Sequence, residues 1–323
     1  MSDPSSSDTL STETHNPPTQ PAFNYSPTTF HLSYGVNQPA IPIEPGIIIS
    51  TWFPDFHGQD ASLSQIAGQP NPLAGPFYVP GAMPGDTLSV TIHSLTPNRS
   101  QGYACKDIHP NMQHPPLPIS ARRREYVTWH IDTHRQTATP LGDFFPDQTV
   151  EIPLRPVLGS IGVARNLSEK IPSRDCGIYG GNMDYPRIAA GSTLHLPVFV
   201  EGGFLCLGDG HALQGAGEIT GNGIEVSCDI SFSVRVNQLG LQWPAGEDAE
   251  FLYTIVNCKP LEQAARAATA QMVNWLRQSY GMNHDQVGIL LGQLVRYELG
   301  NLVSNAYTVA CCFPKSGLPN FAG

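Results

Sequence analysis

Carboxylate and imidazole side chains gather in one glycine-rich stretch of the sequence, residues 180–225. Asp209 and His211 are two positions apart at the end of a predicted strand, so their side chains point to one face. Glu218 and Glu225 follow at seven-residue spacing. Carboxylates together with one imidazole can bind a divalent metal ion and leave a position open for water. This stretch is therefore the first candidate for a site of metal-dependent chemistry.

The same stretch opens with two glycines, Gly180 and Gly181, followed by Asn182 and Asp184. Glycine has no side chain, so the backbone at such positions can approach a ligand closely. Asn and Asp also cap turns through hydrogen bonds from side chain to backbone, and that structural role is the alternative for both residues.

Other reactive residues form weaker candidates. His130, Asp132 and His134 share one face of a predicted strand and imitate a metal site, but no second feature supports them. The chain has no G-x-S-x-G elbow, which argues against an α/β-hydrolase serine. A cysteine nucleophile at Cys176 or Cys206 stays open as an alternative, although Cys206 lies in an apolar strand, where thiols are usually inert.

Composition excludes several classes of partner. The net charge is −10, with only four lysines, and the one basic cluster is residues 122–124. Nucleic-acid binding depends on basic contacts to phosphates, so we expect no nucleic-acid partner. No apolar run approaches the roughly 18 residues that a membrane span needs, and we expect no membrane partner. The N-terminus lacks the pattern of a signal peptide, which predicts a cytoplasmic protein.

Short strands joined by turns are the dominant pattern, because 31 glycines and 30 prolines interrupt the chain. Residues 96–124 and 156–184 are predicted to be long loops. The predicted strands lie in these ranges: 41–51 and 76–94 (each strand, turn, strand), 126–133, 149–154, 194–200, 204–207 and 223–236.

Helical spacing appears only near the C-terminus. Residues 261–279 are alanine-rich and Gly281 follows as a C-cap, and residues 285–299 form a second predicted helix. Strands followed by helices predict a mainly β (α+β) fold, with a sandwich- or barrel-like β core and a C-terminal helical pair. Residues 1–22 are rich in Ser, Thr and Pro and are predicted to be a disordered tail, which leaves residues 23–323 as one β-rich domain.

Four separated motifs resemble the acetamidase/formamidase family. They are GGNMD at 180–184, GDGHALQGAGE at 208–218 with the later Ile-Glu, GAMPGD at 81–86 and LRPVLGSIGVA at 154–164, so the motif core spans about residues 75–235. This resemblance implies a β-rich, homo-oligomeric amidase of formamide, acetamide or similar small linear amides. It also implies a divalent metal ion, zinc or calcium, of which we favour zinc.

The resemblance and the residue types together predict roles for the site. Asp184, Asp209 and His211 would hold the metal ion, and Glu218 would act as general base and then acid. Asn182, with the N–H groups of Gly180 and Gly181 beside the substrate, would stabilise the oxyanion. The products would be ammonia and a carboxylic acid.

One departure keeps a second function class open. The family commonly has an acidic residue where this chain has Ala216. If that carboxylate were a ligand or a base, activity here would be weakened or redirected, and the alternative is a non-catalytic metal- or ligand-binding β module. The sequence leaves open which amide is preferred, which metal is bound, the oligomer size and the role of residues 96–124.

Overall fold

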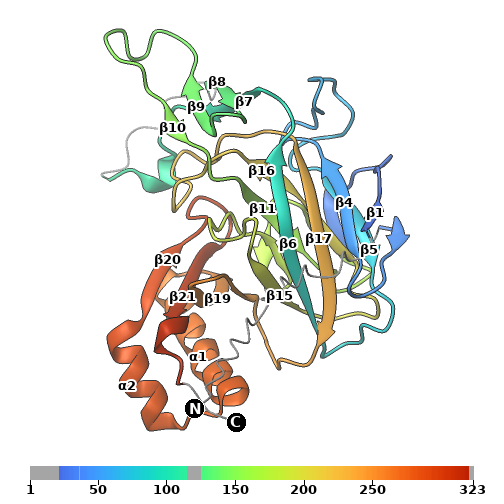
Figure 1. Ribbon diagram of the computed structural model, residues 1–323, viewed down its shortest axis with the longest axis vertical. Coiled ribbons are helices and arrows are strands. Elements are labelled where there is room, and N and C mark those ends of the chain that lie inside the picture. The colour runs from blue at the N-terminus through green and yellow to red at the C-terminus, as the bar shows by residue number, and fades with distance from the viewer. Residues whose placement is uncertain (1–21, 36, 115–124, 320–323) are drawn as a thin grey trace, which may run out of the picture.

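The computed structural model describes residues 22–35, 37–114 and 125–319, and they form a layered β structure with two helices at one end (Figure 1). The larger layer is a nine-stranded sheet. In spatial order its strands are β1 (Ala22–Asn24), β4 (Ile48–Phe53), β17 (Cys228–Asn237), β6 (Thr87–Pro97), β15 (Thr193–Pro197), β18 (Ala245–Glu247), β19 (Phe251–Cys258), β21 (Tyr307–Pro314) and β20 (Arg296–Leu299).

A six-stranded sheet packs against the first half of the large sheet. Its order is β13 (Cys176–Gly177), β14 (Gly180–Asn182), β11 (Val157–Gly162), β16 (Leu205–His211), β5 (Leu73–Tyr78) and β3 (Ile41–Pro42). The rings of Phe77 on β5 and Phe232 on β17 are 5.4 Å apart and fully buried, which joins the two layers. The predicted mainly β fold with a sandwich-like core is confirmed.

Two smaller sheets complete the strands. One contains β10 (Ile152–Pro153), β9 (Thr137–Pro140), β8 (Tyr126–Asp132) and β7 (Gln101–Cys105), and the other pairs β12 (Lys170–Pro172) with β2 (Ser33–Gly35). Short 3-10 turns lie at Pro110–Met112 and Lys315–Gly317. Strand β7 lies within the predicted 96–124 loop, and residues 115–124, with the basic cluster, are outside the described residues.

The C-terminal helices form a second core against the end of the large sheet. Helix α1 (Leu261–Tyr280) buries Ala268, Met272 and Leu276 against β19 and β21, and Gly281 ends it in the left-handed conformation, as the sequence predicts. Helix α2 (His284–Leu294) begins with a capping box at Asn283. The helical pair thus covers one end of the β structure.

Two sequence predictions about these elements are wrong. The second helix ends at Leu294, not 299, because residues Arg296–Leu299 pair as edge strand β20 along β21. The predicted loop at 156–184 contains four strands. These strands were missed because their glycines interrupt the alternation that indicates a strand. Glycine is required at position 162 for the close pairing of β11 with β14, since a Cβ there would lie 2.7 Å from Gly181 N.

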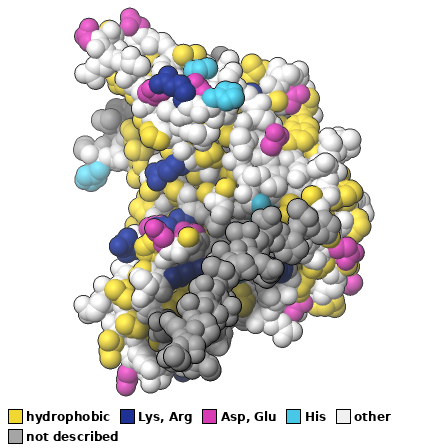
Figure 2. All heavy atoms as spheres, in the orientation of Figure 1, with side chains coloured by type: hydrophobic (Ala, Val, Ile, Leu, Met, Phe, Trp, Pro, Cys, Tyr) yellow, Lys and Arg dark blue, Asp and Glu magenta, His cyan; other side chains and the backbone are white. Residues whose placement is uncertain are grey.

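The remaining sequence predictions concern surface charge, membrane spans and the N-terminal tail. On the face in Figure 2, Lys and Arg side chains of the described residues occur in small groups beside acidic ones. Among the described residues, no helix has the length and hydropathy required to cross a membrane. The predicted tail lies outside the described residues except Ala22, which begins β1, and the boundary at residue 22 stays a prediction.

Candidate functional site

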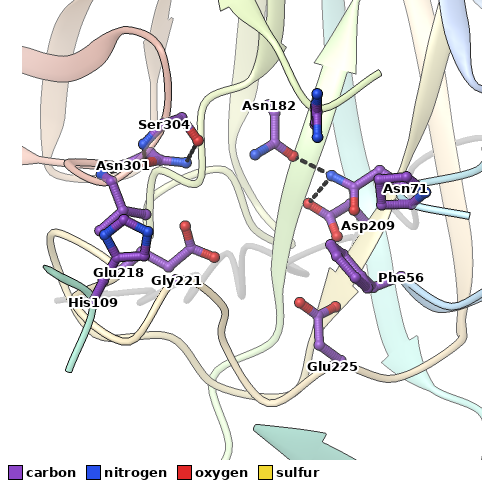
Figure 3. A pocket seen from close by; sticks show the side chains of 13 residues that line it. Phe56, Asn71, His109, Asn182, Asp209, Glu218, Gly221, Glu225, Asn301 and Ser304 are labelled. Carbon is purple, nitrogen blue, oxygen red and sulfur yellow. Dashed lines mark hydrogen bonds between the residues drawn. The ribbon is translucent and has the colours of Figure 1, made fainter. Parts of the chain in front are cut away.

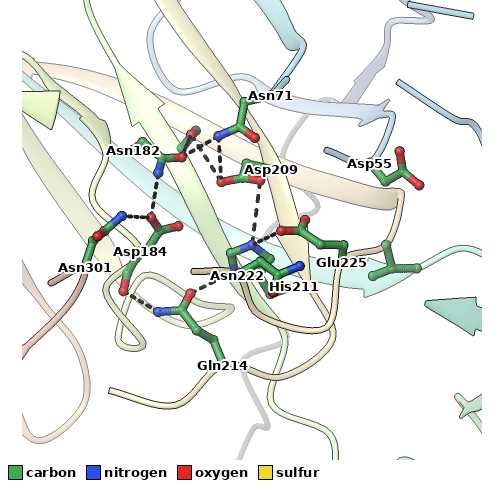
Figure 4. Close-up of polar contacts among 12 residues, drawn as sticks. Asp55, Asn71, Asn182, Asp184, Asp209, His211, Gln214, Asn222, Glu225 and Asn301 are labelled. Atoms are coloured by element: carbon green, nitrogen blue, oxygen red, sulfur yellow. Dashed lines mark hydrogen bonds and ion pairs between the residues drawn. The ribbon is translucent and has the colours of Figure 1, made fainter. Parts of the chain in front are cut away.

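His211 and Asp209 lie at the end of β16 and face one cluster, as their spacing predicts. His211 Nε2 is 3.6 Å from Asp209 Oδ1 and 3.4 Å from Glu225 Oε1 (Figure 4). Glu225 is held there by its own backbone, because its N–H donates to the carbonyl of Tyr103 at 2.8 Å. Strand β7 of the small sheet therefore helps to position a carboxylate of the site.

Hydrogen bonds fix the tautomer of His211. Gln214 Nε2 donates to the backbone carbonyl of Asp184, so Gln214 Oε1 is an acceptor. His211 Nδ1, 2.8 Å from that oxygen, must then carry the hydrogen. In the neutral form of the ring, Nε2 therefore carries the lone pair and faces two carboxylates, which is the orientation of a metal-ligating histidine.

A chain of amides connects the other carboxylates. Asn182 Nδ2 donates to Asp184 Oδ2 at 2.6 Å, and its Oδ1 accepts from Asn71 Nδ2 and from Ser160 Oγ, each at 2.6 Å. Asn71 Nδ2 also lies 3.2 Å from Asp209 Oδ2. This network holds the Asp184 and Asp209 side chains in fixed orientations.

The C-terminal part of the chain contributes Asn301 to the site. Its Nδ2 donates to Asp184 Oδ2 at 2.7 Å, while its Oδ1 accepts from the backbone N–H groups of Val303 and Ser304. Asn71, Gln214 and Asn301 were not predicted from the sequence. Asn71 and Asn301 lie outside every motif, and Gln214 lies within the 208–218 motif without a spacing that marks its role.

Backbone conformation is unusual at the site. Seven described non-glycine residues have positive φ, and four of them belong to the site: Asn71 at 51°, Asp184 at 47°, Asp209 at 62° and Glu218 at 48°. This region is unfavourable for residues with a side chain, and such strain concentrates at functional sites.

The side chains of the site leave no room for a Cβ at two neighbouring glycines, Gly159 and Gly223. A Cβ at Gly159 would lie 2.6 Å from both Asp184 Oδ1 and Asp209 Oδ2, and one at Gly223 would lie 2.7 Å from the His211 ring. Gly159 therefore leaves the space in which the two carboxylates approach each other.

The carboxylates of the site form no ion pair with a Lys or Arg among the described residues, and Arg174 lines only the adjacent cavity. Five carboxylates are buried among the described residues, and Asp55 is paired with buried Arg99. The other four surround the one imidazole of the site; they are Asp184, Asp209, Glu218 and Glu225. Burying unpaired charge is costly, so this cluster requires either protons or a bound cation.

The pKa directions express the same imbalance. Burial, followed by repulsion from Glu218 and Asp209, raises the pKa of Asp184 well above its usual value. Burial raises the pKa values of Glu218 and Glu225 to about 8 each. Burial alone would lower the pKa of His211, but Glu225 and Asp209 outweigh it and raise that pKa well above normal. A divalent cation would reverse these shifts.

The ligand geometry fits a metal ion. Ligand atoms of Asp184, His211 and Glu218 lie within 4.8 Å of one another, and those of Asp209, His211 and Glu225 do as well. Four buried atoms of the cluster have no hydrogen-bond partner among the described residues: Asp184 Oδ1, Asp209 Oδ1, His211 Nε2 and Glu225 Oε2. Carboxylate oxygens and an imidazole nitrogen are suitable ligands for zinc or calcium.

A small cavity opens beside this cluster. Its volume is about 180 Å³, and Glu218, Asn301 and His109 face Asn71 and Asp209 across it (Figure 3). Drug-sized ligands occupy roughly 300–1,000 Å³, so this cavity fits a smaller molecule.

Comparisons with known proteins agree with this geometry. A sequence model of the acetamidase/formamidase family matches residues 157–259, which contain every predicted site residue. The crystal structure of an acetamidase from Yersinia enterocolitica is similar over 93% of this chain and 94% of that one, with a TM-score of 0.80 and 28% identity. An acetamidase structure from Bacillus halodurans covers 90% and 97%, with a TM-score of 0.75 and 25% identity. The chain is thus similar to the acetamidase/formamidase family in sequence over residues 157–259 and in fold over most of its length.

Curated relatives in the family match shorter regions. A Schizosaccharomyces pombe protein named "Putative formamidase" is 27% identical over 221 residues, 52% of each chain. A formamidase of Methylophilus methylotrophus is 46% identical over 50 residues, 16% of this chain and 12% of that one. The chain thus spans about half the length of the first of these relatives.

The fold brings most of the predicted site residues together. Asp184, Asp209, His211 and Glu218 belong to the cluster, and Asn182 lines the cavity. Gly180 and Gly181 are elsewhere: both are buried in strand β14, which pairs with β11 and β13, and neither lines the cavity.

The competing site candidates have structural roles. Asp132 Oδ1 accepts from the backbone N–H groups of His134 and Arg135, which caps a turn. Burial raises the pKa of the Cys176 thiol to about 12 and that of Cys206 further. Neither cysteine lines the cavity, so neither is activated or placed as a nucleophile.

Proposed function

We propose that this protein hydrolyses small linear amides of the formamide and acetamide type to a carboxylic acid and ammonia, with a divalent metal ion. The observation that carries the proposal is the buried cluster of four carboxylates around His211, which has no ion pair with a Lys or Arg among the described residues. That arrangement is unfavourable for the protein alone and favourable around a cation. Similarity to the acetamidase/formamidase family supports the reaction class.

Asp184, Asp209 and His211 would hold the ion, and Glu225 would join them through its unpaired Oε2. We favour zinc over calcium because His211 contributes nitrogen. When bound, the ion polarises the amide carbonyl and lowers the pKa of water from about 15.7 toward 7.

Glu218 is the general base in this proposal. Its carboxylate lines the cavity and lies in one ligand group with Asp184 and His211. It would accept a proton from the attacking water and donate it to the departing nitrogen, so that ammonia leaves. Asn182 uses one N–H for Asp184, and its second N–H is the proposed oxyanion donor.

Ala216 does not favour the non-catalytic alternative. The residue is exposed, and it does not line the cavity. A carboxylate at this position is therefore not needed to complete the buried cluster.

The direct test measures ammonia release from formamide and acetamide together with metal content. We expect turnover that a chelator abolishes and added metal restores. Sensitivity to thiol alkylation without sensitivity to chelators would identify a cysteine amidase instead. Bound metal without turnover of any amide would identify a binding module.

We also propose a homo-oligomer, on the basis of the family resemblance. Light scattering at micromolar concentration tests this part separately, and a strictly monomeric mass would contradict it.

A further inference from the structure

We propose that Asn71 selects the substrate by its nitrogen: its Oδ1 accepts a hydrogen bond from the substrate N–H, so the site prefers amides over esters of the same acid. This inference rests on the proposed amide hydrolysis and adds the residue that recognises the scissile nitrogen. Three observations carry it: a fixed side-chain orientation, a buried oxygen without a partner among the described residues, and a place in the cavity wall.

The orientation of Asn71 follows from the carboxylates. Asp184 Oδ2 accepts from Asn182 Nδ2 at 2.6 Å, so Asn182 Oδ1 must be an acceptor at the other end of that amide. Asn71 lies 2.6 Å from this oxygen and 3.2 Å from Asp209 Oδ2, and both neighbours can only accept. The nitrogen of Asn71 therefore faces the network, and a flipped amide would place oxygen against oxygen twice.

The oxygen of Asn71 is consequently directed away from that network. Asn71 is 2% exposed, and its Oδ1 has no hydrogen-bond partner among the described residues. The residue lines the 180 Å³ cavity beside Asp209 and Glu225 (Figure 3). A buried acceptor without a donor destabilises the protein, so a donor supplied by a ligand would relieve the penalty.

The backbone holds this side chain in place. Asn71 has a φ of 51°, a left-handed conformation that Asn tolerates better than most residues. Its N–H donates to the carbonyl of Phe56 at 3.1 Å, and prolines lie on both sides of it in the chain. The acceptor is therefore preorganised before the substrate arrives.

The chemistry distinguishes substrates by the atom beside the carbonyl carbon. A primary amide presents N–H donors to Asn71 Oδ1. An ester presents an alkoxy oxygen, which would place two acceptors against each other. A site that hydrogen-bonds a substrate N–H rejects analogues without it strongly, because its own polar group is then left unpaired. The carboxylate product would likewise be repelled by Oδ1.

The experiment compares kcat/KM for acetamide and methyl acetate in the metal-loaded protein and in Asn71→Ala. We expect the variant to lose roughly ten- to hundredfold in kcat/KM on acetamide and much less on methyl acetate. Formamide, N-methylformamide and N,N-dimethylformamide extend the series, and only the last lacks an N–H. The variant should lose the preference for the first two.

Asn301→Ala is the matched control, since it removes an amide of the same cavity that contacts Asp184 and not the proposed nitrogen position. It should lower the rates on amide and ester by the same factor. An equal loss on both substrates in Asn71→Ala would overturn the inference and leave the proposed function intact. Loss of bound metal from Asn71→Ala would also overturn it, because Asn71 would then act by holding the metal site, through Asp209 or as a ligand, and not on the substrate nitrogen.

A binding measurement separates this inference from the proposed function. If the wild-type protein releases no ammonia from any amide, the proposed function fails. Ligand-observed NMR with acetamide and methyl acetate then decides the role of Asn71. Preferential acetamide binding that disappears in Asn71→Ala supports the inference, and equal binding of the two compounds rejects it.

Discussion

Two buried histidines each lie 3.6 Å from a carboxylate oxygen, yet their surroundings differ in charge. His195 Nε2 faces Glu247 Oε1, and Lys315 Nζ lies 2.7 Å from the second oxygen of that carboxylate. His211 Nε2 faces Asp209 and Glu225, and neither of these is paired with a Lys or Arg among the described residues. The first cluster contains its own countercharge and the second does not.

The carboxylates respond in opposite directions. Interaction with His195 and Lys315 outweighs burial and lowers the pKa of Glu247 to about 2. Burial raises the pKa values of Glu218 and Glu225 to about 8. The comparison teaches that a buried histidine beside a carboxylate is not by itself a site. A buried carboxylate cluster without its own countercharge, which must take up protons or a cation, is the more specific signal.

The backbone differs in the same way. His195 lies in β15, a strand paired regularly with β6 and β18. Asp184, Asp209 and Glu218 have positive φ, and the pairing of β11 with β16 skips Asp209. The structural cluster thus follows the regular sheet, whereas the candidate site departs from it.

Replacing each histidine by alanine should give the largest difference in effect between the two clusters. His211→Ala should release the metal and lower amide hydrolysis more than about a hundredfold, which exceeds the usual effect of residues that only support a ligand. His195→Ala should keep activity and metal and reduce only the free energy of unfolding, because it leaves Ser89 and Glu247 without their contacts to this ring. Turnover, bound metal and circular dichroism of both variants check this. Full activity in His211→Ala would refute the metal mechanism.

Metal removal should destabilise the protein through the His211 cluster alone. A ligand present at a hundred times its Kd stabilises the folded state by about 2.7 kcal/mol, so chelation should lower the melting temperature measurably. Readdition of zinc should restore it in the wild type and in His195→Ala but not in His211→Ala. An identical thermal shift in all three proteins would place the metal elsewhere.

Replacing a glycine by alanine should have opposite effects on stability in the crowded site and on the open surface of helix α2. Gly159→Ala places a Cβ 2.6 Å from two carboxylate oxygens, so we expect loss of metal and activity and a destabilisation of about 1–3 kcal/mol. Gly288 lies within α2, where an added Cβ would meet nothing within 4 Å, and Gly288→Ala should stabilise by about 0.4–1 kcal/mol. Metal titration and urea unfolding measure both effects. Unchanged metal affinity in Gly159→Ala would show that the carboxylates can separate.

The sequence predicted those parts of the molecule that depend on local spacing. Alternation placed Asp209 and His211 on one side of β16, and helical spacing with a following glycine located α1. The strands between residues 157 and 182 were not predicted, because their glycines interrupt the alternation of apolar and polar side chains. Those glycines instead allow the strands to pack closely. Resemblance to the family supplied the order of the motifs but not their contacts.

The remainder of the site depends on residues distant in the sequence. Asn71 is 111 residues from Asn182, its hydrogen-bond partner, and Asn301 is 117 residues from Asp184. Nothing local to a single asparagine indicates such a contact. Residue type and spacing therefore identify the charged cluster, while the amides that orient it become visible only in the folded chain.

Glu247→Gln should give the smallest effect, and its pH dependence has a definite sign. The pKa of Glu247 is about 2 in the folded protein against an ordinary value of 4.5. A lowered carboxyl pKa stabilises the folded state above pH 4.5, and this contribution disappears as the pH falls from 4.5 toward 2. The side chain is 35% exposed, so water screens the pair with Lys315 and limits the contribution to about 1 kcal/mol or less. Urea unfolding of the wild type and the variant should therefore differ most near pH 7, and the difference should shrink below pH 4.5 and vanish near pH 2. A difference that grows on acidification would show that the charged form of Glu247 does not stabilise the His195 cluster.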